Sequence, residues 1–140
     1  MMDPPRCILL IEDNPDDVLM IRETLASNGW ASDLRVASSG EEGLEQLRAD
    51  ADPASCLVLL DLALPGIDGA DVLREIRRDR YLDRAIVLVL TASDSLADLE
   101  LAGRLRADNY LTKPLDFVEL ECAVGLAIHR SSRRSSAVMP

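Results

Sequence analysis

Four short strand-like runs in this sequence are each followed at once by side chains that could take part in chemistry. These side chains are Glu12 and Asp13, Asp61, Thr91 and Lys113. The clearest run covers residues 57–60, leads straight into Asp61, and is followed by the turn residues Pro65 and Gly66. Such runs are typical of parallel strands that are buried on both faces. Because ligands of open α/β sheets bind at the carboxyl ends of the strands, we expect these side chains to meet in one site.

The acidic members of this set indicate a metal site that handles phosphate. Two carboxylates about 4 Å apart repel each other by about 4 kcal/mol at an effective dielectric constant near 20, and a divalent cation removes that repulsion. Mg2+ prefers oxygen ligands, and Mn2+ accepts the same ones. Thr91 and Lys113 add a hydroxyl group and a positive charge, which suit a phosphoryl group. An aspartate can itself form an aspartyl phosphate, whereas the absence of a glycine-rich phosphate loop argues against a nucleotide.

Taken singly, each of these residues also has an ordinary structural explanation. Asp61 could cap a helix, Thr91 could be a hydroxyl at the end of a strand, and Lys113 could be a solvated charge in a loop. Tyr110 alone fits a core aromatic residue whose hydroxyl group reaches the surface, and Met20 alone fits a core position. For the polar residues the functional interpretation is favoured, because they recur together at successive strand ends, whereas for Met20 the core position stays favoured.

The elements that must hold this site alternate between strand and helix. Capping residues mark the helix starts, most clearly Asn14 before Pro15, and Ser39 three residues before Glu42. The predicted strands cover residues 7–11, 34–37, 57–60, 85–90 and 109–112. The predicted helices cover residues 14–28, 39–49 and 96–105, with two more that begin near residues 68 and 116. This alternation predicts an α/β fold with a doubly wound, five-stranded parallel sheet.

Length and composition indicate a single folded domain. The chain has 140 residues, 48% of them hydrophobic and 29% charged, and its net charge is −10. The acidic balance argues against binding to nucleic acid or to a membrane surface, because both attract basic proteins. We expect an N-terminal segment over residues 1–5, one domain over residues 6–130, and a disordered tail over residues 131–140, which has no hydrophobic periodicity.

Cysteine and histidine usage narrows the chemistry further. The three cysteines, Cys7, Cys56 and Cys122, lack the spacing of a metal site, so we expect them to be small buried residues in a reducing compartment. The only histidine, His129, argues against a histidine-rich metal site and against a histidine-based catalytic triad. Neither a signal peptide nor an apolar run of membrane-spanning length is apparent, so we expect a cytoplasmic protein.

The motifs at the strand ends, taken in order, resemble those of the receiver domain of two-component response regulators. They are Glu12-Asp13, Asp61, Thr91-Ala92 and Lys113-Pro114. The resemblance covers nearly the whole chain, residues 6–130, and implies a flavodoxin-like fold. It implies that Asp61 accepts a phosphoryl group from a kinase phosphohistidine. It also implies a signalling protein that dephosphorylates itself only slowly, rather than an enzyme.

The resemblance implies a role for each residue around Asp61. Asp13, Asp61 and the backbone carbonyl of Ala63 would ligate Mg2+ directly, and Glu12 would act through water.

The phosphoryl group itself would be contacted by Lys113, in cis linkage to Pro114, and by the backbone amide of Ala92. Thr91 would follow a phosphoryl oxygen inward. Tyr110 would rotate into the space left behind and so change the surface formed by the last strand and the last two helices.

Three longer segments, residues 12–17, 90–93 and 113–117, are similar to a subgroup of the family. This subgroup comprises single-domain regulators paired with phytochrome-type kinases. We expect a sensor histidine kinase, or a histidine phosphotransfer protein, to dock on the first helix. There Asp16, Asp17 and Met20 lie opposite the core-facing residues. Pro114 and Leu115 would extend this docking patch.

The last helix carries a second apolar stripe beside its core-facing one. The stripe consists of Val118, Cys122, Leu126 and His129, at spacings of three or four residues. One apolar face is enough for a helix that packs on a domain, so the second face suggests either a partner or a wide contact with the core. We expect a homodimer through this face, since two-fold dimers are the commonest assembly and regulators resembling this subgroup often pair there.

Two other classes of function are compatible with an aspartate at a strand end. Phosphatases of the haloacid-dehalogenase type use such an aspartate as nucleophile and a second aspartate two residues later as general acid. Ala63 holds that second position here. A protein-interaction scaffold that works without phosphorylation would be expected to lack Asp61 or Lys113, and both are present.

Overall fold

The computed structural model describes residues 2–92 and 96–138, and a parallel sheet of five strands organises them. The strands are β1 (Cys7–Ile11), β2 (Leu34–Ala37), β3 (Cys56–Asp61), β4 (Ile86–Thr91) and β5 (Asn109–Thr112). Their order across the sheet is β2-β1-β3-β4-β5, and every neighbouring pair is parallel. The chain therefore winds to one side of β1 and then to the other, which confirms the predicted doubly wound, flavodoxin-like fold.

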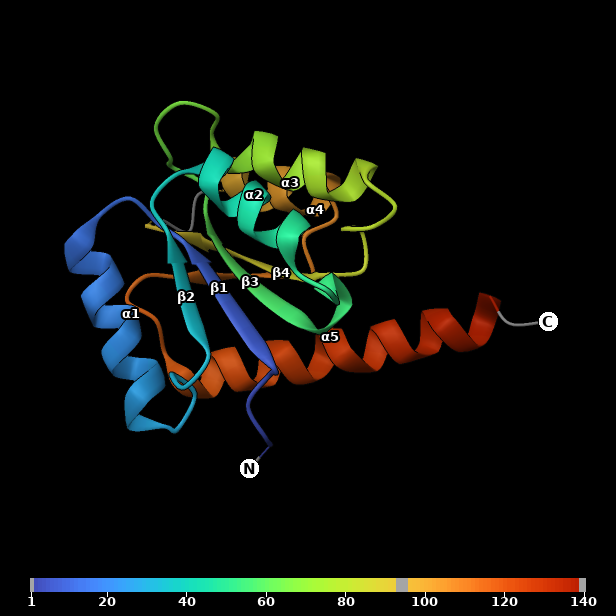
Figure 1. The fold of residues 1–140 in the computed structure, drawn as a ribbon, viewed down its shortest axis with the longest axis horizontal. Coiled ribbons are helices and arrows are strands. Elements are labelled where there is room, and N and C mark those ends of the chain that lie inside the picture. Colours follow the sequence, from blue (N-terminus) through green and yellow to red (C-terminus); the bar gives the residue numbers. More distant parts are fainter. Residues whose placement is uncertain (1, 93–95, 139–140) are drawn as a thin grey trace.

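Helices cover both faces of the sheet (Figure 1). They are α1 (Pro15–Ser27), α2 (Gly40–Ala49), α3 (Gly69–Arg78), α4 (Leu96–Arg104) and α5 (Phe117–Val138), with a 3-10 turn at Pro53–Ser55. Helices α1 and α5 pack on one face, and α2, α3 and α4 pack on the other. Within the described parts of the chain, none of the helices is both long enough and apolar enough to cross a bilayer.

Side-chain caps determine where the helices that follow β1, β2 and β3 begin, as the sequence predicted. Asn14 accepts a hydrogen bond from the backbone N–H of Asp16 at 2.9 Å, and Ser39 accepts one from Glu42 at 3.1 Å. Asp68 caps α3 in the same way. Such caps satisfy N–H groups that have no partner within the helix. The caps therefore let each of these helices begin soon after the strand or loop that precedes it.

Helix α5 is longer than the sequence analysis predicted. A disordered tail was expected from residue 131, whereas the helix continues to Val138. No glycine or proline occurs between residues 126 and 139, so the backbone contains no helix breaker there. The loss of hydrophobic periodicity at residue 131 therefore does not mark the end of the helix. Residues 139–140 of the predicted tail lie outside the described residues.

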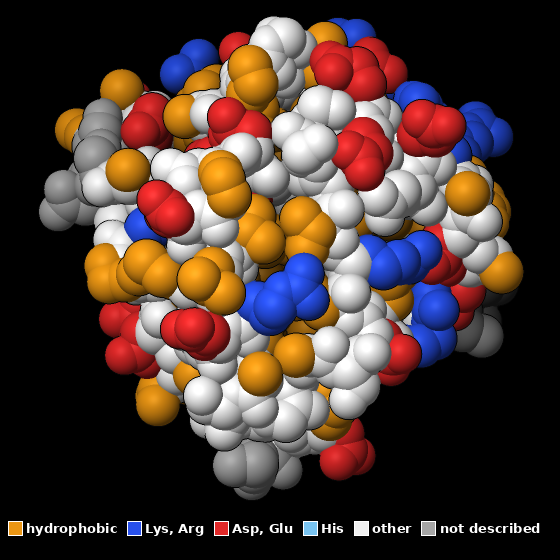
Figure 2. Space-filling view, turned by 60° about the vertical axis from the view of Figure 1, so that its left-hand side comes forward, with side chains coloured by type: hydrophobic (Ala, Val, Ile, Leu, Met, Phe, Trp, Pro, Cys, Tyr) orange, Lys and Arg blue, Asp and Glu red, His pale blue; other side chains and the backbone are white. Residues whose placement is uncertain are grey.

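Helix α1 turns one face to the core and the other to solvent. Ile21 and Leu25 are buried and Val18 is half-buried, as predicted for the inner face. Leu19 and Met20 are 54% and 51% exposed, so Met20 is not a core residue. Figure 2 views the molecule from the side of α1 and shows hydrophobic side chains on this surface, with acidic side chains among them.

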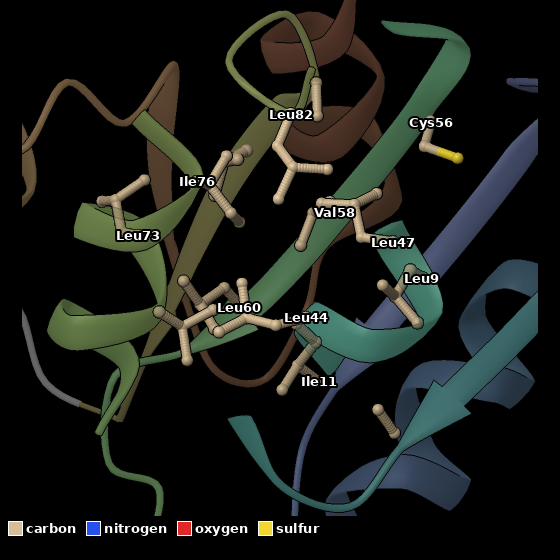
Figure 3. Packing of buried hydrophobic residues seen from close by; sticks show 14 of the residues in the cluster. Leu9, Ile11, Leu44, Leu47, Cys56, Val58, Leu60, Leu73, Ile76 and Leu82 are labelled. Carbon is tan, nitrogen blue, oxygen red and sulfur yellow. The ribbon is translucent and has the colours of Figure 1, made fainter. Parts of the chain in front are cut away.

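Two hydrophobic layers sandwich the sheet. The layer beneath α2 and α3 is shown in Figure 3 and includes Leu9, Ile11, Val58, Leu60, Leu44, Leu47, Leu73 and Ile76. The layer beneath α1 and α5 includes Ile8, Leu10, Leu57, Leu59, Ile21, Leu25, Leu120 and Val124. Alternate residues of β1 and β3 therefore enter opposite layers, which explains why these runs are apolar throughout. Burial of each leucine contributes about 1.5 to 3 kcal/mol, so the central strands form a firm support for the side chains at their ends.

Candidate functional site

Asp61 is the last residue of β3, and its position is closely defined. The residue is only 5% exposed. Its Oδ1 atom accepts a hydrogen bond from the backbone N–H of Ala63 at 3.1 Å, and its Oδ2 atom lies 3.5 Å from Nζ of Lys113. The N–H of Gly69 donates to the carbonyl of Leu62 at 3.1 Å and so ties the following loop to the start of α3. One oxygen thus orients the carboxylate while the other faces a cation.

Glu12 and Asp13 bring two more carboxylates to Asp61, as the sequence predicted. One oxygen from each of the three groups lies within 4.8 Å of the others. Glu12 is buried and Asp13 is exposed. Burial raises the pKa of Glu12 to about 7, although the hydrogen bond from Lys113 acts in the opposite direction. A cluster of oxygen donors with this much negative charge fits a hard divalent cation such as Mg2+.

Lys113 supplies the positive charge at this end of the sheet. Its Nζ atom donates to a carboxylate oxygen of Glu12 and, at 2.9 Å, to Oδ2 of Asp17. Burial alone would lower the pKa of Lys113, but the hydrogen bonds to these two carboxylates and the charge of Asp61 raise it above its ordinary value. Lys113 therefore stays charged at neutral pH. Its bond to Pro114 is cis, as the resemblance implied.

Thr91 ends β4, the strand next to β3, and is 5% exposed. Its Oγ1 atom donates a hydrogen bond to Oδ2 of Asp98 in the first turn of α4, at 3.3 Å. Ala92 follows and is exposed, whereas Ser93 of the predicted motif lies outside the described residues. Tyr110 on β5 is 42% exposed. The hydroxyl group of Thr91 and the partly exposed ring of Tyr110 thus lie on the two strands to one side of Asp61.

A pocket of about 280 Å³ opens beside Lys113. Its lining residues are Asp17, Met20, Ile21, Lys113, Pro114 and Leu115. Four of the predicted docking residues therefore line one pocket, while the fifth, Asp16, is exposed on α1 outside the lining. The pocket joins an apolar surface to the charged end of the sheet.

The predicted stripe on α5 faces outward. Val118 and Leu126 are 69% and 51% exposed, and Cys122 and His129 are exposed as well. The expectation that all three cysteines are buried is therefore wrong for Cys122, because it lies on the side of α5 away from Leu120 and the sheet. The stripe is therefore accessible to a partner, and the homodimer through it stays a prediction.

Sequence reasoning missed the roles of two acidic residues in this site. Asp17 was predicted only as a docking residue, and Asp98 was not singled out. Each lies in the first turn of a helix that follows a strand of the site. Acidic residues are common there because they interact favourably with the helix dipole. That ordinary explanation gave no reason to expect Lys113 and Thr91 as their partners. The one signal in the sequence for these two contacts was an acidic residue in the first turn of a helix that follows a strand of the site.

Replacing Asp13 by alanine should weaken Mg2+ binding roughly tenfold or more, because one of three negative ligands is removed. Isothermal titration of Mg2+ into the variant measures this directly. The matched control is Asp16→Ala, which removes an exposed carboxylate that does not belong to the cluster. Equal affinities of the Asp13 variant and the wild type would exclude Asp13 as a ligand.

Comparison with known proteins relates this arrangement to one family. The model of the response regulator receiver domain matches residues 8–125. Response regulator Rcp1 of Synechocystis sp. is 34% identical over 122 residues, which cover 84% of this chain and 83% of the relative. Transcriptional activator protein IrlR of Burkholderia pseudomallei is 36% identical over 132 residues, covering 94% of this chain and 54% of the relative. The chain thus spans about half the length of the latter protein.

Solved structures give the same result. The bacteriophytochrome response regulator AtBRR has a TM-score of 0.78 and 33% identity, covering 89% of this chain and 94% of its own. The Mn2+-bound form of response regulator Rcp1 has a TM-score of 0.67 and 31% identity, covering 87% and 91%. The family model, the relatives and the solved structures therefore each match most of this chain.

Proposed function

Since this chain belongs to the response regulator receiver family, we propose that Asp61 is its phosphoacceptor, with a sensor histidine kinase or a histidine phosphotransfer protein as donor. Receiver domains are phosphorylated by histidine kinases. The observation that carries the assignment is the setting of Asp61, with one carboxylate oxygen oriented by Ala63 and the other facing Lys113.

Phosphoryl transfer requires each of these groups to do one task. A carboxylate oxygen of Asp61 attacks the phosphorus atom, the P–N bond of the phosphohistidine breaks, and the imidazole leaves. Lys113 is already charged and exchanges part of its contact with the carboxylates for the phosphoryl oxygens. Bound Mg2+, or Mn2+, held by Asp13, Asp61 and the carbonyl of Ala63, with Glu12 acting through water, would supply charge that offsets the transferring group.

The same site gives little help to hydrolysis of the product. Ala63 occupies the position two residues after Asp61, and its methyl group cannot activate water. We therefore expect an aspartyl phosphate that lasts long enough to act as a signal, with slow self-dephosphorylation.

Incubation of the chain with acetyl phosphate and Mg2+ tests this function. Intact mass should rise by one phosphoryl group, and addition of EDTA before the donor should prevent the gain. An unchanged mass in the presence of Mg2+, with a related receiver domain phosphorylated in parallel, would contradict the proposal.

The output of the switch would begin at Thr91. Its hydroxyl group donates to Asp98 in this structure. To contact a phosphoryl group on Asp61, aided by the backbone amide of Ala92, it must give up that partner in α4. Tyr110 on the adjacent strand β5 would then move inward, and the surface of α4, β5 and α5 would change. This surface is the one we propose to contact the next protein in the pathway.

The kinase would dock on the pocket beside Lys113, where apolar Met20 and Leu115 border acidic Asp17. A phytochrome-type kinase is supported by the likeness to the bacteriophytochrome response regulator AtBRR. The pocket lies next to the phosphoacceptor, so a helix of the kinase seated there could bring its phosphohistidine to Asp61.

The variant Met20→Lys should slow phosphotransfer from the cognate kinase about tenfold, because it places a charge in an apolar contact. Phosphorylation by acetyl phosphate, which needs no docking, should keep its wild-type rate. The two rates are measured side by side on one protein preparation. Equal slowing with both donors would indicate a damaged fold and contradict the docking role.

The variant Leu126→Arg should yield a folded monomer if the stripe on α5 is the dimer face. An unpaired charge buried in an apolar interface costs about 3 to 5 kcal/mol, enough to abolish a dimer of ordinary affinity. Light scattering before and after phosphorylation gives the oligomeric state. Leu19→Arg is the matched control, because Leu19 has a similar exposure of 54% but lies on α1. A monomeric wild type in both states would exclude the dimer.

A further inference from the structure

Two buried cysteines lie side by side at the amino-terminal ends of their strands, at the opposite end of the sheet from Asp61. Cys7 begins β1 and Cys56 begins β3, and the two residues are direct partners in the parallel register. They are 2% and 1% exposed. Figure 3 shows Cys56 at the start of its strand, at the border of the hydrophobic layer. Their sulfur atoms and a carboxylate oxygen of Asp50 lie within 4.8 Å of one another.

Two arginines cover this pair and place positive charge beside it. Nη2 of Arg35 lies 2.6 Å from Sγ of Cys7 and 2.6 Å from Oδ2 of Asp50. Nη2 of Arg6 lies 2.7 Å from Oδ1 of Asp50 and 3.5 Å from Sγ of Cys56. The same nitrogen of Arg35 lies 3.8 Å from Sγ of Cys56, so it contacts all three groups of the cluster. The cluster already has its cation, which favours thiol chemistry over metal binding.

The two thiols differ in a way that suits oxidation. The sulfur of Cys7 is in contact with a guanidinium nitrogen of Arg35, at 2.6 Å. Cys56 instead donates its S–H to Oδ2 of Asp50 at 3.4 Å. Burial, the neighbouring Cys7 and the carboxylate of Asp50 all raise the pKa of the Cys56 thiol, so it keeps its proton. The two sulfurs therefore have different partners, a cation beside Cys7 and a proton-accepting carboxylate beside Cys56.

The backbone geometry allows the two sulfurs to bond. Neighbouring strands lie about 4.8 Å apart, inside the range of about 4.4 to 6.8 Å between the Cα atoms of disulfides. Both side chains point to the same face of the sheet, because both belong to the layer beneath α2 and α3. The side chains of Arg6 and Arg35 are 50% and 42% exposed, so movement of these flexible groups opens a path for a small oxidant.

We propose that Cys7 and Cys56 are a peroxide-sensitive thiol pair that closes to a disulfide at the amino-terminal edge of the sheet. Cys7 gives up its proton to water and its sulfur attacks one oxygen of hydrogen peroxide. The O–O bond breaks, the released hydroxide takes up that proton to become water, and Cys7 is left as a sulfenic acid. The sulfur of Cys56 then attacks Sγ of Cys7. The S–O bond breaks, and the departing hydroxide combines with the thiol proton passed through Asp50. In sum, two thiols and one peroxide give one disulfide and two waters.

The test uses the full chain carrying Cys122→Ser, so that the proposed pair are its only thiols. After brief treatment with hydrogen peroxide and removal of the oxidant, the protein is denatured and its free thiols are alkylated. We expect both thiols to be lost together, with a mass decrease of two hydrogen atoms, and to return after treatment with dithiothreitol. Adding Cys56→Ser should stop the reaction at a sulfenic acid on Cys7, which dimedone traps.

Arg35→Gln tests the role of the guanidinium without removing either thiol. Hydrogen bonds to charged groups are strong enough that oxidation should slow roughly tenfold. Circular dichroism confirms that each variant is folded, and oxidation in urea should remove the effect of Arg35. The proposal is overturned if both thiols remain free after peroxide treatment, if Arg35→Gln reacts as fast as its parent, or if reduced protein binds Zn2+ through both cysteines.

Discussion

The Asp61→Asn variant should gain no phosphoryl group from acetyl phosphate or from a kinase, even at saturating Mg2+. An amide is not a nucleophile, and Asp61 is the described carboxylate that ends β3 with one oxygen oriented by the N–H of Ala63 and the other facing Lys113. The fold should survive, because asparagine has nearly the same shape. Loss of one negative charge beside Glu12 should, if anything, raise the free energy of unfolding. Intact mass spectrometry measures the expected complete loss.

The matched control for this experiment is Asp68→Asn. Asp68 lies on the same connection between β3 and α3, and it caps α3. Asparagine caps helices about as well as aspartate, so this variant should be as stable as the wild type and fully phosphorylated. If Asp61→Asn still gained a phosphoryl group, a different residue would be the acceptor. If Asp68→Asn also failed, the effect would lie in the loop and not in the nucleophile.

The sequence predicted which side chains lie together at one end of the sheet, because strand ends are easy to locate. The buried runs of β1 and β3 are apolar at every position, so their last residues stand out. In a parallel sheet all these ends meet at one edge, and Glu12, Asp13, Asp61 and Lys113 do lie together there. The caps Asn14 and Asp68 were also predictable, since they depend only on residues a few positions away.

Contacts between distant segments were harder to predict. Asp17 and Lys113 are 96 positions apart, and the helical period of α1 shows only that Asp17 avoids the core. The ion pair between Asp17 and Lys113 depends on how α1 packs beside the end of β5. No pattern within a short segment of sequence specifies that packing. Cys122 was misplaced for the same reason. A small apolar residue fits the core or the surface of a helix, and the packing of α5 decides between them.

Gly69→Ala should destabilise the protein and slow phosphorylation of Asp61. A Cβ atom on Gly69 would lie 2.3 Å from the carbonyl oxygen of Asp61 and 2.5 Å from Cα of Leu62. Both are backbone atoms, so no flexible side chain can give way. Overpacking of this kind costs about 1 to 3 kcal/mol, which exceeds the small helix-propensity gain of alanine at a first helical position. Urea denaturation should show a lower free energy of unfolding.

The chemical effect follows because relief of the clash must move the backbone that carries Asp61, the proposed phosphoacceptor. The N–H of Ala63, which orients Oδ1 of Asp61, lies on the displaced loop. A shift of about 1 Å can cost up to about 100-fold in rate, so the acetyl phosphate reaction should slow measurably. Gly103→Ala is the control, because its Cβ atom meets nothing within 4 Å and alanine in α4 should stabilise by about 0.5 to 1 kcal/mol. If Gly69→Ala matched Gly103→Ala in both measurements, the backbone of Asp61 would not be held by its contact with α3.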